Sequence, residues 1–227
     1  MSFTDLGLHP TLLKAITASG YEKPTPVQLA AIPAILANND VMAGAQTGTG
    51  KTAAFTLPIL HQLLSQSTLP VQKVQSTQPA LTQSVGTRKA VIRKKVSALI
   101  LTPTRELAQQ VFKNIETYAQ YTNIKAALLY GGVSINPQIK AINAGASIIV
   151  ATPGRLLDHL IKGSLTLNDL QYLVFDEADR MLDMGFKDEI NRILNRVPAQ
   201  RQTLLFSATF DESIFKLSKT LLTDPEL

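Results

Sequence analysis

Short apolar runs alternate with stretches of helical spacing along most of this chain, and this alternation restricts its fold more than any other feature. A short continuous apolar run is typical of a strand that is buried on both faces. Strands that alternate with helices form a mostly parallel sheet with helices covering both sides. We therefore expect strands at 41–43, 97–101, 126–129, 148–150, 173–175 and 203–206, and helices near 12–16, 28–36, 53–64, 105–118, 137–142, 155–161, 178–182, 187–194 and 213–222.

Composition excludes several classes of protein. With 227 residues, of which 45% are hydrophobic, the chain can bury the core of one large α/β domain or of two small ones. Because no apolar run approaches the roughly 20 residues that cross a bilayer, and no signal-peptide pattern opens the chain, we expect a soluble protein without a membrane partner that is not exported by that route. The absence of Cys excludes disulfides and thiolate chemistry. Three scattered histidines, His9, His61 and His159, lack metal-ligand spacing and are expected at the surface or at helix ends.

The positive charge of the chain is concentrated in one segment. The net charge is +5, and six basic residues without any acid lie between Ser65 and Val96. Subtracting these charges leaves the rest of the chain close to neutral. The same region is rich in Gln, Ser, Thr and Pro, so we expect an irregular insertion at 66–95, although Val91 and Ile92 could form a short strand.

A glycine-rich loop follows the first expected strand and precedes a helix, which is the context that a phosphate-binding loop requires. It reads Ala45-Gln46-Thr47-Gly48-Thr49-Gly50-Lys51-Thr52. The two glycines allow the backbone N–H groups to turn toward an anion, Lys51 can reach the outer phosphates, and the Thr52 hydroxyl can hold Mg²⁺. Ala45 stands where this motif usually begins with Gly, so a glycine-rich turn without a ligand is the alternative when the loop is considered alone.

Three acids follow another buried strand, in the run Asp176-Glu177-Ala178-Asp179. A carboxylate at a buried strand end is costly unless it meets a cation, and Mg²⁺ on the phosphate loop is such a cation. Asp176 is then expected to hold the metal, while Glu177 is expected to orient or deprotonate a water aimed at the γ-phosphate. A helix start that carries acids for its dipole explains one carboxylate but not three. The two motifs together predict a nucleoside triphosphatase.

Three further strand ends carry polar loops with hydroxyls, tight turns and usually an arginine. Their candidate residues are Pro103, Thr104, Arg105, Gly131, Gly132, Thr152, Pro153, Gly154 and Arg155. Hydroxyls, turns and helix N-termini of this kind can bind a sugar–phosphate backbone without reading its bases. Ordinary helix capping explains each loop singly, but three such loops on one sheet edge favour backbone binding. Ser207 and Thr209 add two hydroxyls after the last strand.

A stiff turn near the amino terminus offers a candidate base site. Two prolines fix the backbone between Gly20 and Gln28. Tyr21 presents a flat ring, and the Gln28 amide carries both a donor and an acceptor, which suits the edge of adenine. A purely structural elbow is the alternative.

Taken in order, these motifs resemble those of the DEAD-box ATP-dependent RNA helicases, whose name is spelled by residues 176–179. The resemblance covers the chain outside the insertion and implies that 1–227 is the first RecA-like domain, a three-layer α/β fold. It implies an enzyme with ATP and Mg²⁺ as cofactors and RNA as partner. By resemblance, Tyr21, Lys23 and Gln28 contact adenine, Lys51, Thr52, Asp176 and Glu177 form the ATP site, the three loops hold RNA, and Ser207 and Thr209 couple the two sites through Asp179.

The family has a second lobe with an arginine motif that completes the ATP site, and nothing after Thr209 resembles it. We therefore expect this chain to lack that lobe and to bind nucleotide with little turnover. Three alternatives stay open at this point. The chain could be a binding module without turnover, or a motor acting on DNA. A regulatory GTPase is disfavoured because the chain contains no Asn-Lys-x-Asp run for guanine.

Overall fold

Six parallel strands form a single sheet in the computed structural model, which describes residues 1–46, 48–68 and 95–226. Across the sheet the strands follow the order β1-β6-β5-β2-β4-β3. The expected strands are confirmed with small changes at their ends: β1 Val41–Gly44, β2 Ala98–Leu101, β3 Ala126–Leu129, β4 Ile148–Ala151, β5 Tyr172–Asp176 and β6 Gln202–Ser207.

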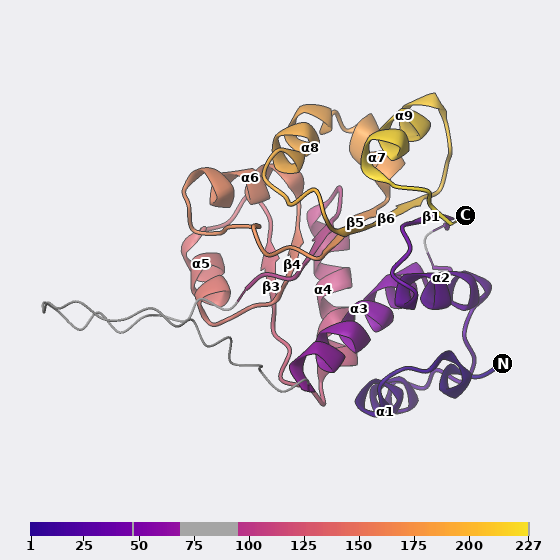
Figure 1. Ribbon diagram of the computed structural model, residues 1–227. Coiled ribbons are helices and arrows are strands. Elements are labelled where there is room, and N and C mark those ends of the chain that lie inside the picture. The colour runs from indigo at the N-terminus through magenta and orange to yellow at the C-terminus, as the bar shows by residue number, and fades with distance from the viewer. Residues whose placement is uncertain (47, 69–94, 227) are drawn as a thin grey trace, which may run out of the picture.

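Helices cover both faces of this sheet, because alternate residues of each strand point to opposite sides. Val174 of β5 belongs to one apolar core, whereas its neighbours Leu173 and Phe175 belong to the other. The first core is covered by η1 Phe3–Leu6, α1 Pro10–Ala18, α2 Pro26–Leu36, α3 Lys51–Thr68 and α4 Arg105–Ala119. The second is covered by α5 Asn136–Asn143, α6 Pro153–Ile161, α7 Ala178–Asp183, α8 Lys187–Leu194 and α9 Glu212–Leu221. Figure 1 shows the resulting three layers, with α1, α2 and α3 on one side of the sheet and α6, α8 and α9 on the other.

Several helices begin directly at the carboxyl ends of strands. The Thr104 side chain accepts a hydrogen bond from the N–H of Leu107 at 3.3 Å and so caps α4. α6 begins with Pro153, whose missing N–H costs nothing in the first helical turn. The N-termini of these helices therefore lie at one edge of the sheet, where their partial positive charge is available to an anion.

The structure corrects or completes two sequence expectations. Gln66–Thr68 form the last turn of α3 rather than part of an irregular insertion, while 69–94, including Val91 and Ile92, lie outside the described residues. His159 does lie in the last turn of α6, but its side chain is fully buried and is not at the surface.

In the described part of the chain, no helix is both long enough and apolar enough to span a membrane.

Candidate functional site

The strand order divides the carboxyl edge of the sheet into two halves. β1, β6 and β5 are neighbours, and they lead into the phosphate loop, into Ser207–Thr209 and into the acidic run. β2, β4 and β3 are the other three neighbours, and they lead into the three polar loops. All six connections start from the same edge because every strand pair is parallel. The residues proposed for nucleotide chemistry and those proposed for backbone binding are therefore separate but adjacent.

The phosphate loop depends on its glycines. Gly48 and Gly50 both have φ = +87°, a left-handed conformation that other residues adopt only with strain. At Gly50 a Cβ atom would also lie 2.5 Å from Nε2 of Gln28, so no side chain fits there. Ala45 is buried in the apolar core, and its N–H donates to the Ser207 carbonyl at 3.0 Å, so a methyl group is accommodated where Gly is usual.

Lys51 lies buried between the two carboxylates that follow β5. Its Nζ is 3.1 Å from Oδ1 of Asp176 and 3.2 Å from Oε1 of Glu177. Burial raises the pKa of Asp176 to about 6, and the neighbouring Lys51 charge opposes that rise. The loop and the acidic run are thus held together by a buried cation that is also placed to reach a phosphate.

Asp176 fits a hard divalent cation. Its Oδ1 pairs with Lys51, whereas its buried Oδ2 takes part in no hydrogen bond, and an unsatisfied carboxylate oxygen is the kind of ligand that Mg²⁺ prefers. Thr52, the second candidate ligand for Mg²⁺, is the last residue of the phosphate loop and lies half-buried in the first turn of α3. The described residues contain no cluster of three or more potential metal-binding acids or histidines. Mg²⁺ usually takes only one or two protein ligands together with phosphates and waters.

Glu177 has an unusual backbone conformation. Its φ of 58° and ψ of 55° are left-handed, which costs a non-glycine residue about 1 kcal/mol or more. The side chain is held between Lys51 and Arg180, whose Nη1 is 3.4 Å from Oε2 of Glu177. Strain of this kind is concentrated at functional sites, since the surrounding structure must maintain it.

Asp179 receives the loop that follows β6. Its Oδ2 accepts hydrogen bonds from the hydroxyl and the N–H of Thr209, at 3.0 and 2.9 Å. Ser207 donates its hydroxyl to the Thr209 carbonyl at 2.8 Å and so stabilises the same turn. Partial burial alone would raise the pKa of Asp179, but the hydrogen bonds from Arg180 and Thr209 outweigh it and lower the pKa. The ends of β5 and β6 are therefore joined through an ionised carboxylate.

Gln28 is joined to the phosphate loop through its buried side chain. Its side chain is buried, its Oε1 accepts from the N–H of Thr25, and its Nε2 donates to the Gly50 carbonyl, both at 3.0 Å. Tyr21 and Lys23 are exposed nearby along the chain. The bond from Gln28 to Gly50 joins residues 22 positions apart, and sequence reasoning missed it.

The two arginines of the polar loops differ in their surroundings. Arg105 is exposed, with its guanidinium 5.2 Å from the centre of the Tyr130 ring. The Arg155 side chain is only 10% exposed, and its Nη2 donates to the Val133 carbonyl at 2.9 Å. Gly131, Gly132 and Gly154 are exposed, whereas Pro103 and Pro153 are buried. The structure thus leaves Arg105 open to a ligand and engages Arg155 within the protein.

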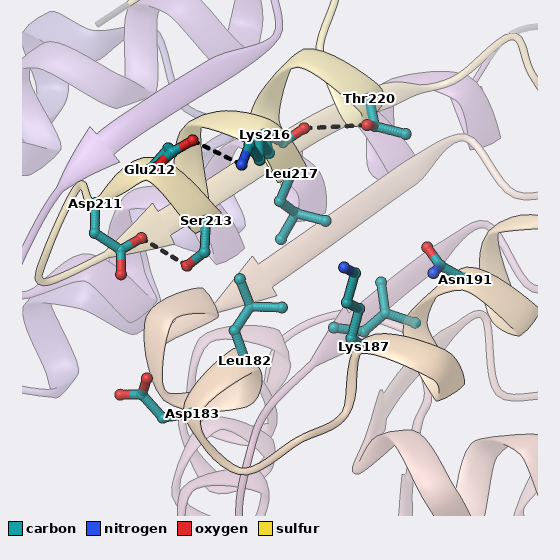
Figure 2. A pocket seen from close by; sticks show the side chains of 11 residues that line it. Leu182, Asp183, Lys187, Asn191, Asp211, Glu212, Ser213, Lys216, Leu217 and Thr220 are labelled. Atoms are coloured by element: carbon teal, nitrogen blue, oxygen red, sulfur yellow. Dashed lines mark hydrogen bonds and ion pairs between the residues drawn. The ribbon is translucent and has the colours of Figure 1, made fainter.

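A separate hollow lies between α7, α8 and α9. It has a volume of about 740 Å³, and none of the residues proposed for nucleotide or backbone binding lines it. Figure 2 shows Leu182 and Leu217 facing one another across it, with the Lys187 amine nearby. The acid Glu212 already pairs with Lys216 at 2.7 Å on α9.

Comparisons with known proteins all point to one family. A family model described as DEAD/DEAH box helicase matches residues 25–217. ATP-dependent RNA helicase DeaD of Buchnera aphidicola is 41% identical over 99% of this chain and 33% of its own length. DEAD-box ATP-dependent RNA helicase CshA of Bacillus subtilis is 41% identical over 100% of this chain and 40% of its own length. The chain therefore spans less than half the length of these relatives.

The fold gives the same answer. A crystal structure of a DEAD box protein from Methanococcus jannaschii matches with a TM-score of 0.82 and 38% identity, over 100% of this chain and 55% of that one. The three layers described above, one sheet with helices on both faces, are thus a RecA-like α/β fold, as the sequence resemblance implied.

Proposed function

The chain belongs to the DEAD/DEAH box helicase family, and on that premise we propose that it binds ATP with Mg²⁺ at one half of its sheet edge and RNA at the other. One observation carries this proposal. The strands β1, β6 and β5 bring the phosphate loop and the acidic run together, while β2, β4 and β3 bring together the loops with exposed turns and hydroxyls. Two ligand sites on adjacent halves of one edge can influence each other through the loops between them.

In the proposed nucleotide site, the N–H groups of residues 46 and 48–50 and the N-terminus of α3 hold the phosphates, while Thr47 of the same loop lies outside the described residues. Lys51 exchanges part of its contact with Asp176 and Glu177 for the outer phosphates, and Thr52 and Asp176 hold Mg²⁺. The metal, when bound, neutralises charge on the β- and γ-phosphates. Glu177 orients the attacking water, and its fixed position between Lys51 and Arg180 supports that assignment. Tyr21, Lys23 and Gln28 are assigned to adenine, with Gln28 linking the base to the loop through Gly50.

In the proposed RNA site, the residues of the three polar loops contact the sugar–phosphate backbone and leave the bases unread. The exposed Arg105 supplies a charge-assisted contact, and Gly131, Gly132 and Gly154 allow close approach of the backbone. Asp179 couples the sites, since it joins the loop after β6 to the acidic run. A cytoplasmic role in RNA remodelling belongs to the same proposal.

We further propose that this chain alone turns over ATP slowly, because the family carries its catalytic arginine motif on a second lobe. Catalytic arginines that another domain supplies are worth about 10³–10⁵ in rate. The test is steady-state phosphate release from the 227-residue chain, with and without single-stranded RNA. Measurable binding of Mg²⁺-ADP together with RNA-independent, near-background release is expected. Low turnover would be refuted if RNA raised the ATP hydrolysis rate of this chain to the rate of a longer relative. RNA and DNA strands that bind equally well would instead favour a strand-binding module without preference for RNA.

A further inference from the structure

A buried polar network lies behind the loop that follows β3. His159 is fully buried, with its Nε2 3.0 Å from Oε1 of Gln138 and its Nδ1 2.8 Å from the hydroxyl of Ser164. The same Gln138 oxygen accepts from Nη1 of Arg155 at 3.2 Å, so the amide oxygen, not the nitrogen, faces both residues. Since an amide oxygen can only accept, the neutral imidazole must carry its proton on Nε2. Burial, with a contribution from Arg155, lowers the pKa of His159 to about 4 and so favours that neutral form.

This network holds both ends of the Gly131-Gly132 turn. With its oxygen facing His159 and Arg155, Gln138 directs its Nε2 to the Tyr130 carbonyl at 3.0 Å, immediately before the glycines. Arg155 donates to the Val133 carbonyl at 2.9 Å, immediately after them. Each of these bonds joins residues that lie on different elements of the fold.

From this geometry we propose that Gln138 and His159 are positioning residues that fix the Gly131-Gly132 turn and the start of α6 in one arrangement for RNA. The inference rests on the proposed function, because it deepens the assignment of these loops to the RNA backbone. His159 orients the Gln138 amide, Gln138 and Arg155 hold the two carbonyls, and the turn between them is left exposed. Neither Gln138 nor His159 contacts RNA.

Preorganisation is the physical reason for such a network. Glycine has more backbone freedom than any other residue, so two adjacent glycines are costly to order when a ligand binds. A turn that is already fixed by buried hydrogen bonds does not incur that cost during binding. Gln138 is buried, as is His159, so water cannot easily replace a bond that is lost.

The test measures RNA affinity and nucleotide affinity on the same 227-residue chain. The RNA probe is a short fluorescent single-stranded oligouridylate, and the nucleotide is fluorescent Mg²⁺-ADP. Gln138→Met keeps the volume but removes the hydrogen bonds, and we expect it to weaken RNA binding about tenfold while nucleotide affinity stays within about twofold. His159→Leu should have a similar effect. His159→Gln restores an amide donor in place of Nε2–H and should bring RNA affinity back to within about twofold of the wild type.

A matched control is Gln62→Met. Gln62 also donates to a backbone carbonyl, that of Ile35 at 3.1 Å, but this carbonyl lies at the end of α2, away from the polar loops. We expect it to leave RNA affinity unchanged. Hydrogen exchange of the amides at 131–135 gives a second readout, which should accelerate in Gln138→Met but not in the control.

The outcomes are distinguishable. A wild-type chain without measurable RNA affinity overturns the proposed function and this inference together. If Gln138→Met binds RNA with wild-type affinity, and the hydrogen exchange of amides 131–135 is unchanged, the inference alone is overturned. If His159→Leu does not fold, Gln138→Met and the exchange data still decide the matter.

Discussion

Acidification from pH about 7.5 to about 5.0 should destabilise the chain through His159. The pKa of this buried imidazole is lowered to about 4, below its ordinary value of 6.5, so the unfolded state binds more protons between these values. Stability is therefore lost as the pH falls through this range. At about 1.36 kcal/mol per pKa unit, the full gap corresponds to about 3 kcal/mol, and about 1–2 kcal/mol of it should be expressed by pH 5.0.

The assay is urea unfolding of the wild type and of His159→Gln at both pH values. Comparison with a variant is needed because Asp176, whose pKa is raised to about 6 by burial, contributes with the opposite sign over the same range. Arg155, Asp158 and Lys162 are the charged groups that act on the imidazole, and they are unchanged in the variant. His61→Gln is the comparison variant, since burial also lowers the pKa of His61, but its side chain is only partly buried and its removal should change the pH dependence less. Equal pH dependence of the wild type and His159→Gln would refute the reasoning.

Two further predictions concern the nucleotide site. Gln28→Ala should remove most of a preference for ADP over GDP that is worth about 1–3 kcal/mol. It should also loosen the phosphate loop, because the hydrogen bond to Gly50 is lost. Equal calorimetric affinity of the wild type for ADP and GDP would contradict the assignment of Gln28 to adenine. Lys51→Ala should weaken nucleotide binding itself, whereas Glu177→Gln in a longer, catalytically active form should leave ATP bound and stop its hydrolysis. Normal turnover in Glu177→Gln would show that another group activates the water.

The elements of this fold could be predicted because their patterns are local. Buried strands such as Ala98–Leu101 are continuous apolar runs, and α4 has a clear helical repeat that starts at a Thr cap. The sequence pattern ends α3 too early, because the polar residues of Gln66–Thr68 resemble the insertion that follows them. Composition alone does not show where a helix stops when its last turn faces solvent.

The arrangement of the site depended on contacts that no local pattern contains. Nothing in the sequence places β6 between β1 and β5, and that order is what divides the sheet edge into two halves. The burial of His159 was missed for a similar reason, since its partner Gln138 lies 21 residues away. Arg155 is among the residues that the sequence offers for RNA, but the sequence does not show that its guanidinium donates to Val133 and Gln138.

The division of the sheet edge can be tested directly by mapping amide chemical shifts of the chain in the presence of Mg²⁺-ADP and, separately, of single-stranded oligouridylate. The account predicts that ADP shifts the amides that follow β1, β5 and β6, including those of Gly48 and Gly50. It predicts that RNA shifts those that follow β2, β3 and β4, including Gly131, Gly132 and Gly154. Shifts caused by RNA that cluster on the phosphate loop, or on a face away from the strand ends, would contradict it.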